Sequence, residues 1–282
     1  MGIEKVIAAS AFDASEAQQR CAEFRLRILE MSQRVTALHM APAFSCMEIT
    51  DAIYSGLMHD DQQNKSSDTF IMSKGHGYLA QLVILESRGV IPISEINRYC
   101  TPEGILGAHP DLGTPGIAAA TGSLGHGLGM SLGIAIAERN MAESREMLPG
   151  TVYVVLSDGE LQEGSTWESI ILASSLGVRN LVAVVDNNDY QSLGKTSETH
   201  PSLYPLAEKF ESFGWEAATV DGHDSSAIVE SISSRVGDRP FMLVAKTIKG
   251  KGVSFMENVP VWHYRSPSVE ECAVAVAEIT GR

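Results

Sequence analysis

Cysteine is scarce in this sequence, with four residues in 282. Cys21, Cys46, Cys100 and Cys272 lie far apart and form neither a C-x-x-C pair nor a spacing typical of a metal site. This pattern excludes a dense disulfide framework and is typical of proteins that work in a reducing compartment. The cysteines therefore favour a cytoplasmic protein.

Long apolar segments are also missing. No stretch approaches the roughly 20 apolar residues that a membrane span needs, and the N-terminus lacks the apolar core of a signal peptide. Met1-Gly2 begins like a myristoylation signal, but Val6 stands where that signal has Ser or Thr. The sequence predicts a cytoplasmic location and no membrane partner.

Positive charge is in short supply. The chain has 21 Lys and Arg against 35 Asp and Glu, which gives a net charge of −14 and a pI near 5.0. A nucleic-acid partner would require a basic stripe, so this balance argues against one. Any anionic ligand must be bound by donors placed locally.

Linkers, repeats and low-complexity tracts are absent as well. A chain of 282 residues can bury around three quarters of its unfolded surface in one domain. We therefore expect residues 1–282 to form a single domain.

Two buried strands and the helix between them give the fold class. Residues 151–156 (TVYVVL) and 181–186 (LVAVVD) are short apolar runs rich in Val, and residues 164–176 have the composition of a helix. Together they predict a βαβ unit in a parallel sheet. The chain is therefore expected to be an α/β protein, a parallel sheet with helices on both faces.

Polar residues follow both strands directly. Asp158 and Asn188 each lie two residues beyond a strand, and ligands of such sheets bind beyond the carboxyl ends of the strands. Mg²⁺ takes oxygen ligands in near-octahedral geometry and uses few protein ligands when a substrate phosphate is present. The sequence predicts that Asp158 and Asn188 hold Mg²⁺ against a diphosphate.

Two other phosphate-binding motifs fail on spacing. Gly125, Gly127 and Gly129 alternate, but Leu132 stands where G-x-G-x-x-G requires its third Gly. The segment Lys249-Gly250-Lys251-Gly252 lacks the G-x-x-x-x-G-K-[ST] pattern of a P-loop. Neither a dinucleotide fold nor a P-loop enzyme is indicated.

Several segments in one order carry a closer resemblance. They are FIMSKGHG at 70–77, GAHPDLGTPG at 107–116, TGSLGHGLG at 121–129, SDGELQEG at 157–164 with DNN at 186–188, and IKGKGVSFMEN at 248–258 before Trp262-His263. This arrangement resembles the transketolase family, from about Arg25 to His263. Ser157 replaces the first Gly of the usual Gly-Asp-Gly signature, and it would be strained if that position required a positive φ.

The resemblance implies a thiamine diphosphate (ThDP)-binding, PP-type domain and assigns roles to individual residues. Asp158, Asn188 and the carbonyl of Tyr190 would hold Mg²⁺. His76, Gly159 and His263 would contact the diphosphate, because imidazoles and backbone N–H groups are suitable donors to phosphate oxygens.

The resemblance assigns three further roles. Gly122 and Leu124 would lie against the aminopyrimidine of the cofactor, and His39, His109 and again His263 would line the substrate channel. Glu163 resembles the acid that couples cofactor sites between subunits.

His39 has an unusual context. Apolar residues from Cys21 to Leu38 recur at three- and four-residue spacing, which predicts an amphipathic helix that ends just before His39. The family usually has Gly after this His, whereas Met40 to Phe44 are bulkier and include a proline. Tyr264 stands where Gly often follows the last His. His59, His200 and His223 carry no motif and are interpreted as surface or satisfied core residues.

The resemblance covers only the N-terminal half of a transketolase. It implies a partner subunit that carries the pyrimidine-binding and C-terminal domains, an α₂β₂ assembly, and transfer of a two-carbon ketol unit from a ketose phosphate to an aldose. Two alternatives stay open: the α-subunit of a 2-oxo acid dehydrogenase, and a non-catalytic ThDP-binding regulatory module. The sequence does not identify the sugar.

Overall fold

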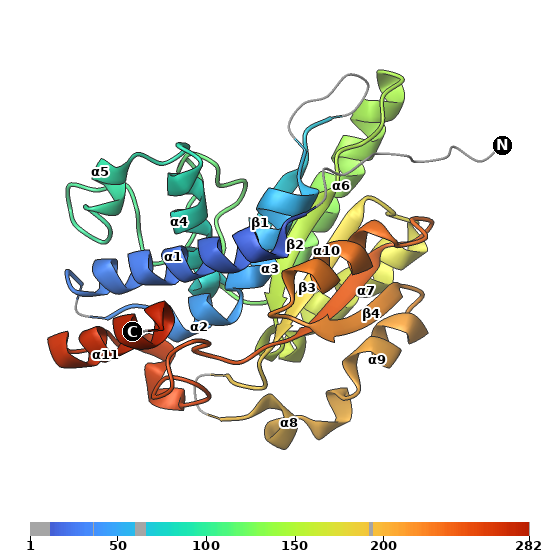
Figure 1. The fold of residues 1–282 in the computed structure, drawn as a ribbon. Coiled ribbons are helices and arrows are strands. Elements are labelled where there is room, and N and C mark those ends of the chain that lie inside the picture. Colours follow the sequence, from blue (N-terminus) through green and yellow to red (C-terminus); the bar gives the residue numbers. More distant parts are fainter. Residues whose placement is uncertain (1–11, 36, 60–65, 192–193, 282) are drawn as a thin grey trace.

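A five-stranded parallel sheet forms the centre of the molecule. The computed structural model describes residues 12–35, 37–59, 66–191 and 194–281, and the sheet has the order β1-β2-β3-β5-β4 (Figure 1). The strands are β1 Thr69–Met72, β2 Val152–Ser157, β3 Leu181–Asn187, β4 Glu216–Asp221 and β5 Phe241–Lys246. The predicted strands at 151–156 and 181–186 are β2 and β3, within one residue at each end.

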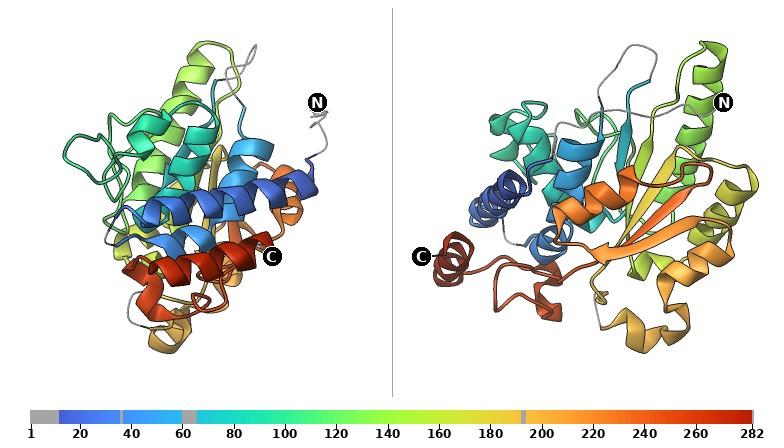
Figure 2. Two further views of the ribbon diagram at one scale, coloured as in Figure 1. Left: turned by 60° about the vertical axis from the view of Figure 1, so that its left-hand side comes forward. Right: turned by 45° about the vertical axis from the view of Figure 1, so that its right-hand side comes forward.

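Helices cover both faces of the sheet, so the predicted α/β class is confirmed (Figure 2). Alternate strand residues face opposite layers: Phe70 and Met72 lie in one core, and Ile71 lies in the other. The first layer contains α1 Ala14–Ser32, α3 Met47–Ala52, α4 Tyr78–Ser87 and α10 Ser225–Ser233. The second contains α6 Gly127–Ser144, α7 Gly164–Ser175 and α9 Leu206–Ser212.

Shorter elements connect or flank these layers. They are α2 Met40–Ser45, the π-helical turn Ile53–Leu57, the 3₁₀ turns Gly75–Gly77, Gly159–Gln162, Pro201–Leu203 and Pro260–Tyr264, α5 Ile93–Ile96, α8 Thr196–Thr199 and α11 Val269–Thr280. Helix α11 begins with a capping box between Ser268 and Glu271 and packs on α1.

The first helix is shorter than the sequence predicts. Helix α1 begins after Asp13, which accepts hydrogen bonds from the N–H groups of Ser15 and Glu16, but it ends at Ser32. Val35 and Leu38 therefore lie in the connection that leads to His39. Their carbonyls have tertiary partners instead: that of Leu38 accepts from Arg265 N at 3.1 Å, and that of Val35 accepts from Ser266 Oγ at 2.7 Å. These hydrogen bonds to the segment after His263 hold Val35 and Leu38 outside the helix, although the apolar periodicity of the sequence predicts that the helix continues to Leu38.

The segment after His39 is a buried helix. Helix α2 starts at Met40, and Pro42 lies in its first turn, where a missing N–H costs no helical hydrogen bond. Every residue of α2 is buried. The bulk of this segment thus fills the core under His39.

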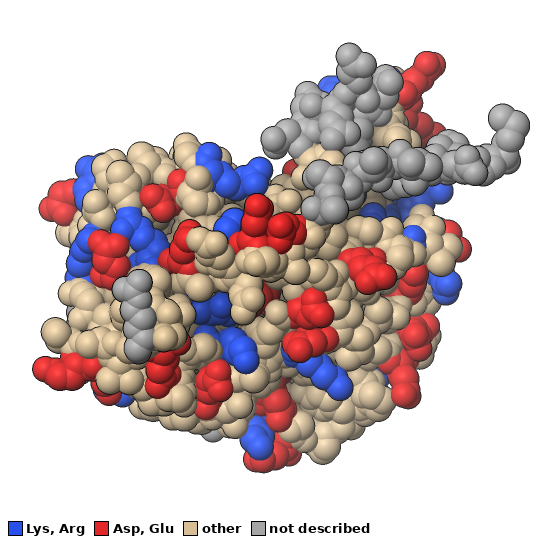
Figure 3. Space-filling view, in the orientation of Figure 1, with Lys and Arg blue, Asp and Glu red and all other residues tan. Residues whose placement is uncertain are grey.

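The surface carries charges of both signs. On the face drawn in Figure 3, acidic and basic side chains are interspersed, without a broad basic region. None of the helices within the described ranges is long and apolar enough to cross a membrane.

Candidate functional site

Asp158 is a buried carboxylate at the carboxyl end of β2. It is 1% exposed, and its oxygens accept from Gly159 N (2.8 Å), Asp189 N (2.6 Å) and Thr196 Oγ1 (3.2 Å). Burial, and then the nearby charge of Asp186, raises its pKa to about 7 although the backbone N–H groups lower it. The carboxylate therefore lacks enough nearby positive charge to offset its burial.

Asn188 follows β3 and is held in one orientation. Its Nδ2 donates to Ser45 Oγ (3.0 Å) and to Asp186 Oδ2 (3.3 Å), and its Oδ1 accepts from Tyr190 N (2.9 Å). Between them, Asp189 has a φ of +62°, a conformation that Asp tolerates better than most residues. This turn directs the Asp189 N–H at Asp158, so the ends of β2 and β3 meet as predicted.

Ser157, which replaces the Gly of the signature, causes no strain. It is the last residue of β2, lies outside the positive-φ residues, and is 3% exposed. Its Oγ accepts from Glu160 N at 3.2 Å. The position requires a small residue but no positive φ.

Lys249 is a functional candidate that the sequence analysis missed. It follows β5, is 1% exposed, and its Nζ donates to the carbonyls of Tyr190 (3.4 Å) and Gln191 (3.2 Å) and lies 3.0 Å from His263 Nδ1. Burial, and then Lys74, lowers its pKa to about 8. The Gly-Lys-Gly context was the available signal, but the resemblance assigned no role to its lysine.

A second buried lysine lies below this site. Lys74 pairs with Asp186 and donates to the carbonyl of Pro42 at 3.2 Å. Asp186 also accepts from Ser45 Oγ (2.8 Å) and from Thr247 Oγ1. Burial alone would lower the pKa of Lys74, but the Asp186 carboxylate raises it above its ordinary value. The pair fixes the carboxyl ends of β1, β3 and β5 together.

Four histidines from distant segments gather at one place. His39 has ring-centroid distances of 5.3 Å to His109, 5.5 Å to His263 and 6.3 Å to His76, and His76 lies 5.5 Å from His263. Burial is the largest cause that lowers all four pKa values, to about 4 for His39 and about 3 for His263. The imidazoles are therefore neutral near pH 7 and can accept a proton or a hydrogen bond.

Gly122 and Leu124 lie on a tightly packed turn. Gly122 has a φ of +128°, and a Cβ there would lie 2.7 Å from His109 Cδ2, so this position requires glycine. The turn is anchored by Glu160, whose Oε1 accepts from Gly125 N (2.9 Å) and from Ser73 Oγ. Glu160 is fully buried, and it is another positioning residue that the sequence analysis missed.

Gly159 and Glu163 mark the start and the end of a short 3₁₀ turn. Gly159 begins this turn and donates its N–H to Asp158. Glu163 is exposed at the N-cap of α7. The structure thus gathers the metal, diphosphate and histidine candidates at the carboxyl edge of the sheet, while Glu163 lies at the surface beside them.

The donor set suits Mg²⁺ more than a softer metal. The described part of the chain contains no group of three or more His, Cys, Asp or Glu side chains arranged to hold a metal. The oxygens present at the strand ends are one carboxylate, one amide oxygen and one backbone carbonyl, which Mg²⁺ accepts when phosphate and water complete its shell. The buried, undercompensated Asp158 fits a cation at this position.

The fold and the site define an α/β domain with a buried polar site at the carboxyl ends of its parallel strands. Residues 17–273 match the thiamine diphosphate binding domain of transketolase. The chain belongs to the transketolase family, and it contains the ThDP-binding domain of that family. The predicted family and fold are confirmed.

Relatives of similar length are components of transketolases. The chain is 34% identical over 263 residues to one of the subunits of the apulose-4-phosphate transketolase of Phocaeicola vulgatus, covering 92% of both chains. It is also 34% identical over 268 residues to one of the subunits of the 6-deoxy-6-sulfo-D-fructose transketolase of a Clostridium species, covering 93% of this chain and 95% of that one. The enzyme class is a transketolase-type transferase, as predicted.

Solved transketolases share the fold over a part of their length. The enzyme from Leishmania mexicana superposes with a TM-score of 0.86 at 23% identity, covering 94% of this chain and 41% of that chain. The enzyme from Campylobacter jejuni gives 0.86 at 21% identity, covering 95% and 43%. The chain thus spans about two fifths of these longer proteins.

Proposed function

We propose that this chain binds ThDP with Mg²⁺ and acts as one subunit of a split transketolase. The reaction is transfer of a two-carbon ketol unit from a ketose phosphate to an aldose. The observation that carries the proposal is the convergence of Asp158, Asn188, Lys249 and four histidines at the carboxyl ends of β1, β2, β3 and β5. Residues 1–282 are proposed to form one ThDP-binding domain that works in the cytoplasm.

The residues present fit the metal and the diphosphate. Asp158, Asn188 Oδ1 and the carbonyl of Tyr190 are the proposed Mg²⁺ ligands. Because Ser45 and Asp186 take the Nδ2 of Asn188, its oxygen is the atom available for a cation. His76, His263 and the Lys249 ammonium are proposed to contact the diphosphate, to which each can donate a hydrogen bond. The Gly159 N–H is proposed to do the same by exchanging its bond to Asp158 for one to the diphosphate.

The protein's contribution to the chemistry is orientation and proton transfer. When bound, the cofactor supplies a nucleophilic carbon for ketol transfer. Gly122 and Leu124 are proposed to lie against its aminopyrimidine. Partial burial lowers the pKa values of His39, His109 and His263, so their imidazoles are neutral near pH 7 and can orient the sugar hydroxyls through hydrogen bonds. Proton transfer with these hydroxyls is proposed to take place in the bound complex.

A second subunit is proposed to complete the site. Relatives that this chain covers almost entirely are named as single components of transketolases with more than one chain, and the partner would supply the pyrimidine-binding and C-terminal domains in an α₂β₂ assembly. Exposed apolar residues on α7 and just after it, Ile171, Leu172 and Leu176, form a face suited to burial in an interface. Glu163 lies at the start of the same helix, which supports its proposed role between cofactor sites.

The donor is proposed to be a phosphorylated or sulfonated ketose. Two relatives are named for apulose-4-phosphate and 6-deoxy-6-sulfo-D-fructose. Selectivity between phosphate and sulfonate would lie largely in the partner chain.

The test is isolation of the tagged chain from its own cells with Mg²⁺ and ThDP. Native mass spectrometry should show a stoichiometric second polypeptide with ThDP bound, and the complex should transfer ketol units from a ketose phosphate while the separated chain does not. Full ketol transfer by the chain alone would refute the split architecture. Pyruvate decarboxylation without ketol transfer would favour the 2-oxo acid dehydrogenase alternative, and a lone homodimer without activity would favour a regulatory module.

A further inference from the structure

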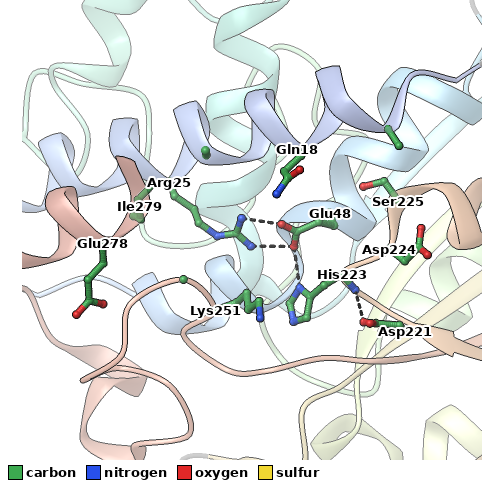
Figure 4. Close-up of a pocket in the computed structure, with 13 residues that line it drawn as sticks. Gln18, Arg25, Glu48, Asp221, His223, Asp224, Ser225, Lys251, Glu278 and Ile279 are labelled. Carbon is green, nitrogen blue, oxygen red and sulfur yellow. Dashed lines mark hydrogen bonds and ion pairs between the residues drawn. The ribbon is translucent and has the colours of Figure 1, made fainter. Parts of the chain in front are cut away.

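A buried polar relay lies behind the candidate site, on the layer formed by α1 and α3. It consists of Arg25, Glu48 and His223, and we call it the Arg25 relay. Arg25 on α1 donates from Nη1 to Glu48 Oε1 (2.6 Å) and from Nη2 to Glu48 Oε2 (2.8 Å). His223 Nδ1 lies 2.9 Å from Glu48 Oε2. Figure 4 shows Glu48 between Arg25 and His223. The three side chains line a cavity of about 480 Å³.

The relay ends on the backbone next to Lys249. The N–H of Ile248 donates to His223 Nε2 at 2.8 Å. Because Nε2 accepts this bond, the proton of the neutral ring must lie on Nδ1, where it is donated to the Glu48 carboxylate. One residue further along, Lys249 reaches the carbonyl of Tyr190 and the ring of His263. The His223 ring thus holds the backbone at the residue that precedes Lys249.

The same relay also holds the helix that follows His39. Arg25 Nη2 donates to the carbonyl of Phe44 on α2 at 2.9 Å. Helix α2 in turn accepts from the loop of Lys249, through Gly250 N and the carbonyl of Ala41 at 3.0 Å. Elements that carry His39 and Lys249 are therefore fixed to one another and to α1 through Arg25.

The charges of the relay are fully paired. Burial alone would raise the pKa of Glu48, but the Arg25 guanidinium and the His223 Nδ1–H lower it to about 2. A bidentate Arg–carboxylate pair of this kind is rigid as well as strong. The His223 ring is therefore held by an ionised partner in one orientation and tautomer.

We propose that His223 is a positioning residue for the cofactor site, which holds the backbone at Ile248 and so places Lys249 for the diphosphate. The proposal rests on the proposed function, because the diphosphate is the ligand that Lys249 is placed to meet. His223 itself does not touch the cofactor.

The test compares His223→Phe, which keeps a planar ring but has no polar atom, with His223→Gln, which keeps one donor and one acceptor. His200→Gln, at an exposed position, is the matched control. All are prepared as the complex isolated with its partner chain, and the dissociation constant for ThDP is measured at saturating Mg²⁺. We expect His223→Phe to raise this constant by roughly 10-fold, the scale seen for groups that orient a ligand-binding side chain, and His223→Gln to recover part of the loss.

A double-mutant cycle separates positioning from general stability. If His223 acts through Lys249, His223→Phe should have little further effect on ThDP affinity in a Lys249→Met background. Amide hydrogen exchange at Ile248 in the cofactor-free chain should also accelerate in His223→Phe, and not in His200→Gln, whatever the enzyme's activity.

The outcomes are distinguishable. Unchanged ThDP affinity in His223→Phe, or an effect that adds fully to that of Lys249→Met, would overturn the positioning role. Unchanged exchange at Ile248 would overturn the hydrogen bond on which it depends. Failure of the wild-type complex to bind ThDP would instead refute the proposed function. If His223→Phe does not fold, the affinity and exchange of His223→Gln decide, because a flexible amide cannot hold its donor and acceptor in the directions that the ring fixes and should still alter both.

Discussion

Two buried carboxylates in this protein have opposite electrostatic environments. Glu48 and Asp158 are 8% and 1% exposed, yet the pKa of Glu48 is lowered to about 2 and that of Asp158 is raised to about 7. Burial pushes both values upward. Arg25 reverses the effect at Glu48, whereas the neighbouring charge of Asp186 adds to it at Asp158.

The difference separates a structural network from a ligand site. In the Arg25 relay every charge has its partner within the chain, so nothing further has to bind. At the strand ends, hydrogen bonds and the charge of Lys74 offset the burial of Asp158 only in part, and a cation would lower its free energy. A buried carboxylate whose charge is not fully compensated is a reason to expect a metal, and one with a bidentate arginine is not.

The largest expected effect comes from Asp158→Asn. The substitution removes the proposed charged ligand, so the affinity for Mg²⁺ and ThDP should fall by at least about 100-fold, since even the groups that orient metal ligands contribute roughly 10–100-fold. Isothermal titration calorimetry of the complex with its partner would measure the loss. Asp111→Asn, at an exposed loop position, is the control. Retained affinity would mean that Asp158 does not hold the metal.

Glu48→Gln should act on stability first. It leaves Arg25 buried without a countercharge, and breaking a buried pair in this way costs about 3–5 kcal/mol of the free energy of unfolding. Urea unfolding of the cofactor-free chain would measure it. Glu16→Gln removes an exposed acid 3.9 Å from Arg20 and should change stability by less than about 0.5 kcal/mol. A loss below about 1 kcal/mol for Glu48→Gln would show that the relay is not rigid.

The two carboxylates should also respond to pH in different windows. Asp158 has a raised pKa, so its ionised form is penalised above pH 7 and the penalty is relieved as pH falls from about 7 toward 3.8. Glu48 has a lowered pKa, so its stabilisation is complete above pH 4.5 and is lost as pH falls toward about 2. The histidines outside the Arg25 relay are common to wild type and variants and cancel in each difference, whereas His223 loses its carboxylate partner in Glu48→Gln.

The difference in the free energy of unfolding between wild type and each variant, measured against pH, reports the two pH windows. Relative to wild type, cofactor-free Asp158→Asn should gain stability as pH rises from about 4 to about 7, by up to about 1.4 kcal/mol per pH unit, and then level off. The disadvantage of Glu48→Gln should instead be constant above pH 4.5 and shrink only in stronger acid. Parallel pH profiles for the two variants would contradict the assigned environments.

The sequence was sufficient where local patterns coincide with the fold. Two Val-rich runs predicted β2 and β3, and the order of the Gly-flanked histidine segments identified the family. It was insufficient where tertiary hydrogen bonds decide. The end of α1 depends on bonds between the connection before His39 and the segment after His263, and no periodicity reports these.

The dependence on tertiary contacts also explains why the sequence did not predict the roles of Lys74, Lys249 and His223. Lys74 and Lys249 lie inside motifs whose glycines and histidines were assigned, but their role depends on burial beside Asp186 and Tyr190. His223 carries no motif and was interpreted as a surface or core residue. Only the fold shows that its ring lies between Glu48 and Ile248, which are far apart in the sequence.

The smallest expected effect comes from Tyr264, and it distinguishes the exposed rim of the site, where Tyr264 lies, from the buried floor that contains Asp158. The ring of Tyr264 lies 4.5 Å from that of His39, yet Tyr264 is 53% exposed, so it can narrow the entrance without supporting the cofactor. Tyr264→Ala should change KM for the ketose donor by a few-fold, the scale of one partly buried packing contact, and leave ThDP affinity as in wild type. Tyr264→Phe keeps the ring and should change neither. Steady-state kinetics of the complex with its partner would measure both constants, and a loss of ThDP affinity in Tyr264→Ala would place this ring in the floor with Asp158 rather than at the rim.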